Sequence, residues 1–200
     1  MKLSYIILLS IAAIAYFYIQ LWDDRLVTPQ YLVLLFICTL YGRYKKDTNM
    51  THIAGYIFVA SSTTFIIFER GLINHVTPEE NPLLQGIVIY GTQMAFSLIT
   101  VCVLIFRVQL SRLISKSPQI QLTNFDGIFH WLFIYCSLIY LLAMLEHIAW
   151  TYFNMKSWTL IYDNFEGLIY ISWALCCGGL LTMMICSPEL KSNSQKRETS

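Results

Sequence analysis

The sequence predicts an all-α fold, a polytopic integral membrane bundle of six transmembrane helices. Two observations predict it. Of the 200 residues, 56% are hydrophobic and only 12% are charged, whereas a soluble domain carries about 25% charged residues. The hydrophobic residues also fall into blocks of about 20 residues, the length of helix that crosses a bilayer. This composition excludes an ordinary soluble domain.

The first two predicted helices cover residues 3–22 and 29–44. The first follows a single lysine and resembles a signal peptide. Its apolar run continues to Trp22, however, and exceeds the usual signal-peptide core of about 7–15 residues, so we expect an uncleaved helix. The second is predicted to begin at Thr28-Pro29, because Thr caps helix N-termini and Pro suits the first helical position.

The next two predicted helices cover residues 52–68 and 83–106. The hydroxyl run 61–64 is expected to serve helix packing, because Ser and Thr form hydrogen bonds within and between membrane helices. Gln93, Ser97 and Thr100 follow the i, i+4, i+7 spacing of one helix face, which we expect to point toward other helices. Residues 107–116 have the pattern of a short basic amphipathic helix on the lipid headgroups.

The last two predicted helices cover residues 127–153 and 158–186, and the second is expected to end at Ser187-Pro188. Residues 1–187 then form one transmembrane domain, and 188–200 are expected to be a disordered cytoplasmic tail because they are polar. The six cysteines all lie in apolar blocks without a CxxC motif, so they are expected to be free thiols.

The basic residues predict the orientation. With six spans, ten Lys and Arg residues fall on one side and three on the other. The ten are Lys2, Arg43, Lys45, Lys46, Arg107, Arg112, Lys116, Lys191, Lys196 and Arg197, and the three are Arg25, Arg70 and Lys156. Cytoplasmic loops carry the excess of basic residues, so both termini are predicted to be cytoplasmic. The expected location is a bacterial inner membrane.

Four charged or titratable residues interrupt the apolar stretch 139–173: Glu146, His147, Asp163 and Glu166. Such residues are costly inside a bilayer and by default mark a functional site. A short turn near residues 155–156 would make the last two helices antiparallel and place Glu146 level with Glu166. Each would lie about 9 Å outward of its helix midpoint, still within the apolar layer of the outer leaflet.

Helical spacing extends this candidate site. Cys136, Tyr140, Ala143 and His147 share one stripe, and Asp163, Glu166, Tyr170 and Cys177 share another. Small and polar residues on one stripe indicate a face toward the bundle interior. The candidate residues for binding a ligand or proton are Glu146, His147, Asp163, Glu166, Tyr140 and Tyr170.

Three interpretations of these residues remain open. Glu146 and Glu166 would be structural if they were hydrogen-bonded or paired with Arg70, Arg25 or Lys156. They would instead form a binding or sensing site if the pocket took a cation, a proton or a small polar ligand. The third interpretation is intramembrane acid–base catalysis by paired carboxylates and a histidine.

Under the binding interpretation, the ligand could be a metal ion. The candidate ligands are His147, Glu146, Glu166, Glu69 and His75. No HxxxH or HExxH spacing supports such a site, and the sequence requires no cofactor, although a divalent metal fits these residue types.

We therefore expect a membrane protein that binds or senses a small ligand, proton or cation at an outer-leaflet acidic and histidine site, in a non-enzymatic role. The alternatives are a small transporter or transporter accessory subunit, and an intramembrane acid–base enzyme. The expected partners are the lipid bilayer and either another membrane protein in a larger complex or a second copy of the chain. No basic run with interleaved aromatics indicates nucleic acid.

Overall fold

The computed structural model describes residues 7–9, 11–13, 24–73, 81–115, 120–123 and 125–198. Every regular element among them is an α-helix, so the predicted all-α class is confirmed for this part of the chain. The helices are α2 (Asp24–Tyr44), α3 (Thr48–Glu69), α4 (Pro82–Ile105), α5 (Arg107–Ile114), α6 (Asp126–Tyr152) and α7 (Leu160–Glu198).

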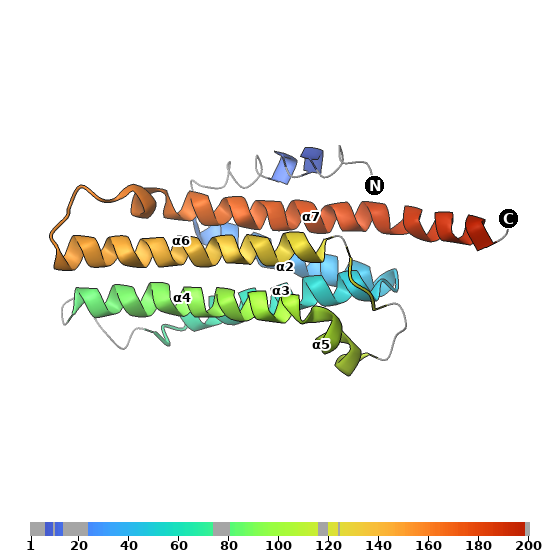
Figure 1. Cartoon of the computed structure of the whole chain (residues 1–200), viewed down its shortest axis with the longest axis horizontal. Coiled ribbons are helices and arrows are strands. Elements are labelled where there is room, and N and C mark those ends of the chain that lie inside the picture. Colours follow the sequence, from blue (N-terminus) through green and yellow to red (C-terminus); the bar gives the residue numbers. More distant parts are fainter. Residues whose placement is uncertain are drawn as a thin grey trace.

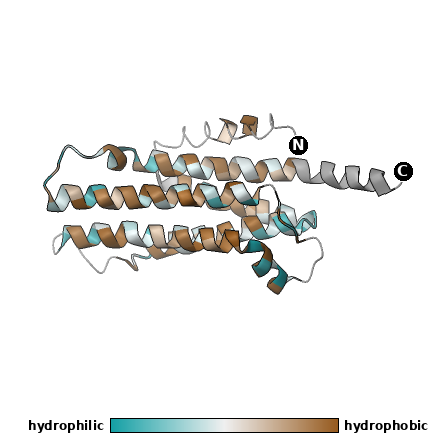
Figure 2. Cartoon of the chain, viewed as in Figure 1, coloured by the Kyte–Doolittle hydropathy of each residue, from teal (hydrophilic) through white to brown (hydrophobic). Residues whose placement is uncertain are grey.

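Four of these helices are long and apolar enough to cross a membrane: α3, α4, α6 and the Leu160–Ile185 part of α7. Hydrophobic residues run along most of their length (Figure 2). Helix α2 has 21 residues but is not among the four. The predicted first helix, 3–22, lies outside the described residues except for helical pieces at 7–9 and 11–13. The chain therefore has the character of an integral membrane protein, while six spans and the orientation of the termini stay predictions.

The five long helices run side by side (Figure 1) and form a closed ring. Helix α2 packs on α3, α3 on α4, α4 on α6, α6 on α7, and α7 returns to α2. Their buried side chains, such as Tyr31, Ile57, Phe129 and Leu180, form one continuous core. This arrangement brings side chains from all five helices toward a common centre.

Two helix starts differ from the sequence prediction. Helix α2 begins at Asp24, so Pro29 lies inside the helix and not at its first position. One proline near a helix start removes a single backbone hydrogen bond, which the rest of the helix tolerates. Helix α3 begins at Thr48 and not at 52, because the Asp47 side chain accepts a hydrogen bond from the Met50 amide at 3.1 Å and caps the helix.

The remaining boundaries agree closely, with one exception. Helices α4 and α6 each begin and end one residue from the predicted positions. Within the residues whose side chains the structure describes, α7 is long and apolar enough to cross a membrane over Leu160–Ile185. The helix itself continues to Glu198, so the predicted stop at Ser187-Pro188 is not observed.

The described cysteines are free thiols, as predicted. Cys38, Cys136, Cys176 and Cys177 are buried, and Cys102 is exposed. The four buried cysteines pack as small apolar side chains, and none of the five described cysteines forms a disulfide.

Candidate functional site

Glu146 caps the start of α7. Its Oε2 accepts a hydrogen bond from the Tyr162 amide at 2.7 Å, and its Oε1 accepts one from the Ile161 amide at 3.2 Å. Amides in the first turn of a helix have no partner within the helix, and the helix dipole favours a negative charge there. Glu146 therefore ties α6 to α7, as in the structural interpretation, although its partners are backbone amides and not Arg70 or Lys156.

The prediction that Glu146 and Glu166 lie at the same depth along the two helices is wrong. Glu146 contacts Ile161 and Tyr162, and Glu166 lies four residues beyond Tyr162, about 6 Å farther along the helix axis. The segment 153–159 is not helical and includes Asn154 at φ 55°, so it does not form a symmetrical turn. Figure 1 shows that α6 extends farther at this end than α7. Glu166 itself is exposed.

His147 fixes α6 to the start of α4. Its Nε2 donates a hydrogen bond to the Pro82 carbonyl at 3.0 Å, and since a carbonyl only accepts, this nitrogen carries the proton. The imidazole lies directly over Gly86, where an added Cβ would come within 2.1 Å of the His147 Cδ2 atom. Glycine at position 86 is therefore what allows the histidine ring to reach α4.

A cavity of about 280 Å³ lies beside these residues, and we refer to it as the end cavity. It is lined by Glu146, His147, Trp150, Trp158, Thr159, Tyr162 and Asp163. Three of the predicted site residues thus share one cavity. Asp163 is exposed, and its Oδ2 accepts a hydrogen bond from the Thr159 hydroxyl at 2.8 Å.

The other predicted site residues lie elsewhere. Tyr170 is buried with its ring 5.5 Å from that of Trp173, and Tyr140 lines a second cavity deeper in the bundle. Glu166 is not among the residues lining the end cavity.

Of the predicted metal ligands, Glu146 and His147 line the end cavity and Glu166 does not. Glu69 is exposed at the end of α3, and His75 lies outside the described residues. Within the described part of the chain, no three His, Cys, Asp or Glu side chains are close enough to hold a metal ion.

The aromatic lining of the end cavity was missed as a site in the sequence. Trp150 and Trp158 fit the pattern of an interfacial belt. Two spacings in the sequence could have indicated this lining: Trp150 follows Glu146 by four residues, and Tyr162 follows Trp158 by four. Such pairs share a helix face where the chain is helical, and here they meet across the α6–α7 connection.

A second cluster missed in the sequence lies at the opposite end of the ring. Arg107 was expected on the lipid headgroups, but its side chain is only 1% exposed and forms an ion pair with Asp126. It also donates to the Gln121 carbonyl at 2.7 Å and to the Asn49 side chain at 3.0 Å. This cluster holds the α4–α5 corner against the starts of α3 and α6.

The end cavity combines two carboxylates, a histidine and three large aromatic side chains. Aromatic faces attract cations, and carboxylates neutralise them. Comparisons of this chain with protein-family models, curated proteins and solved structures find no match.

Proposed function

We propose that this integral membrane protein binds a small organic cation in the end cavity, on the outer side of the bilayer. The observation that carries the proposal is the lining of the cavity: Trp150, Trp158 and Tyr162 together with the carboxylate of Asp163. Cages of aromatic side chains are a recurring means of binding substituted ammonium groups, and a nearby carboxylate adds to the attraction.

The geometry favours an organic cation over a metal ion. Both oxygens of Glu146 already accept backbone hydrogen bonds, whereas Asp163 is exposed, accepts a hydrogen bond from the Thr159 hydroxyl on Oδ2 and contributes a second carboxylate to the lining. A structural or catalytic metal site needs three or four ligands of suitable type. A cavity of about 280 Å³ also has room for a molecule with several non-hydrogen atoms.

Two further observations support binding or sensing as the role. Glu146 joins α6 to α7, and His147 joins α6 to α4, so a ligand in this cavity would act on the contacts of three helices. Glu146 and His147 are also each hydrogen-bonded to backbone groups of a neighbouring helix, so both side chains help to hold the helices together at the cavity. The outer location is supported by the predicted orientation, in which only Lys156 lies on the α6–α7 connection.

The test is a titration of the purified protein in nanodiscs with tetramethylammonium chloride, read by isothermal calorimetry, with sodium chloride as the ionic-strength control. We expect saturable binding to the wild type, and about two- to fivefold weaker binding to Trp158→Ala, since a cation–π contact with an exposed ring is worth about 0.5–1 kcal/mol. Asp163→Asn should weaken binding similarly.

Trp131→Ala is the matched control, because Trp131 is an exposed tryptophan far from the end cavity: it is 65% exposed and Trp158 is 58% exposed. Absence of saturable binding to the wild type would contradict the proposal. Equal losses of affinity in Trp131→Ala and Trp158→Ala would contradict it as well.

A further inference from the structure

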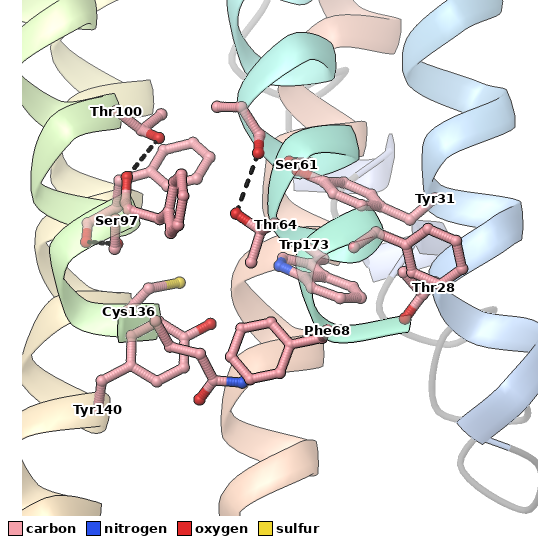
Figure 3. A pocket seen from close by; sticks show the side chains of 15 residues that line it. Thr28, Tyr31, Ser61, Thr64, Phe68, Ser97, Thr100, Cys136, Tyr140 and Trp173 are labelled. Atoms are coloured by element: carbon pink, nitrogen blue, oxygen red, sulfur yellow. Dashed lines mark hydrogen bonds between the residues drawn. The ribbon is translucent and has the colours of Figure 1, made fainter. Parts of the chain in front are cut away.

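The middle of the five-helix ring contains a second cavity, of about 180 Å³, which we call the central cavity. Every helix of the ring contributes to its lining, for example through Tyr31 of α2, Thr64 of α3, Gln93 of α4, Tyr140 of α6 and Trp173 of α7. Figure 3 shows Tyr31, Thr64 and Tyr140 among the side chains that converge from different helices of the ring. The central cavity is therefore formed by all five long helices together.

The size of the central cavity suits a molecule with one ring. An engineered protein cavity of about 150 Å³ with apolar walls binds benzene. The central cavity is of similar size, and much of its wall is aromatic: Tyr31 and Trp173 stack with centroids 4.6 Å apart and planes 4° from parallel. A flat ring finds extensive van der Waals contact against such a wall.

The polar lining indicates what the molecule carries. The Thr64, Ser97 and Thr100 hydroxyls each donate to a backbone carbonyl, at 3.0, 2.8 and 2.8 Å respectively. Gln93 Oε1, in contrast, is buried and accepts no hydrogen bond. A buried carbonyl without a partner costs about 1–3 kcal/mol, and a ligand with an O–H or N–H donor would recover it.

The lining also indicates the charge of the molecule. None of the described residues that line the central cavity is Asp, Glu, Lys, Arg or His. An ion placed there would have no opposite charge to compensate its loss of water. The lining therefore selects a neutral molecule.

We infer that the central cavity is a binding site for a neutral single-ring molecule carrying a hydrogen-bond donor, such as a phenol, which donates to Gln93 Oε1. This site is separate from the end cavity in its lining and in its ligand chemistry: one takes a neutral donor in the centre of the ring, the other a cation at its end. The two sites share no lining residue among those described.

The test uses two probes of nearly equal size, 4-fluorophenol and fluorobenzene, which differ by the hydroxyl donor. Binding to the purified protein in micelles is measured by ¹⁹F NMR against protein-free micelles. The wild type is expected to bind 4-fluorophenol about tenfold more tightly than fluorobenzene, the equivalent of one net hydrogen bond.

Two pairs of variants localise the binding. Gln93→Leu should bring the ratio of the two affinities close to one, while Gln85→Leu, on the same helix and outside the cavity lining, should leave it unchanged. Ala60→Leu fills the cavity and should abolish binding of both probes, while Ala95→Leu, at an exposed position of α4, should not.

Three results would overturn the inference: saturable binding of neither probe to the wild type, equal affinity of the wild type for both, or unchanged binding in Ala60→Leu. If Gln93→Leu fails to fold, the Ala60→Leu and Ala95→Leu pair still decides whether the central cavity is the site.

Discussion

The Arg107 guanidinium and the Asp126 carboxylate form an ion pair in which the two side chains are only 1% and 9% exposed. The guanidinium belongs to the first residue of α5, and the carboxylate to the first residue of α6. Thr123 also donates to the same carboxylate, through its amide at 2.6 Å and its hydroxyl at 2.9 Å. The pair therefore closes the connection between α4 and α6, the two helices that contact each other most extensively.

Removal of one partner of this pair should be strongly destabilising. Arg107→Met or Asp126→Leu leaves an uncompensated buried charge, for which a loss of about 3–5 kcal/mol is expected. The double variant should lose less than the sum of the two single variants. Arg112→Met, at an exposed position of α5, is the control and should change stability by less than about 0.5 kcal/mol. Unfolding in mixed micelles measures all four, and strictly additive losses would refute the coupling.

Gly86→Ala should disturb the contact of α4 with α6. The new Cβ would lie within 2.1 Å of the His147 ring, so the imidazole must move and its bond to Pro82 is lost. We expect about 1–3 kcal/mol of destabilisation and weaker tetramethylammonium binding. Gly91→Ala is the control on the same helix, because a Cβ there meets no atom within 4 Å. Its stability should equal or exceed that of the wild type, since Ala favours helices. Equal effects of the two substitutions would contradict this packing.

Glu146→Ala should loosen the start of α7. The loss of two hydrogen bonds from the Ile161 and Tyr162 amides to a charged acceptor should cost about 1–3 kcal/mol. Glu146→Gln keeps one acceptor oxygen and should lose less. Hydrogen exchange of these two amides should accelerate in the Ala variant, and Glu69→Ala, at an exposed carboxylate, should leave it unchanged. Unaltered exchange in Glu146→Ala would show that the cap does not form.

The proposed orientation predicts which engineered cysteines a membrane-impermeant maleimide reaches in intact cells. Lys156→Cys, on the α6–α7 connection, should be labelled from outside. Leu113→Cys, exposed on α5 at the opposite end of the bundle, should be labelled only after the membrane is opened. The unsubstituted protein gives the background from native cysteines such as Cys102. The reverse pattern would invert the topology and place the end cavity on the cytoplasmic side.

The sequence predicted correctly those features that depend on the residues of a single segment, such as helix boundaries and helix faces. Apolar blocks placed α4 and α6 within one residue at each end, because the length of an apolar run is a local property. Helical spacing likewise predicted that Gln93, Ser97 and Thr100 face other helices, and all three line the central cavity. The cavity was not predictable, because its shape depends on how five separate helices meet.

Interactions between distant segments were the part that the sequence did not reveal. Arg107 belongs to a stretch with amphipathic, basic spacing, and only the approach of Asp126, 19 residues later, shows why it is buried. Glu146 was placed opposite Glu166 by counting from a symmetrical turn, and the non-helical residues 153–159 invalidate that count. Its α7 partners are backbone amides, which no residue pattern can indicate.

The parallel rings of Tyr31 and Trp173 make the protein its own optical reporter. Tyr31 belongs to α2 and Trp173 to α7, the two helices whose contact closes the five-helix ring. The distance between the two aromatic side chains therefore changes if α2 separates from α7. Emission from an indole is quenched or shifted when the phenol stacked on it moves. Fluorescence of a variant that keeps Trp173 as its sole tryptophan would follow the opening and closing of the α2–α7 contact in real time, without any attached dye.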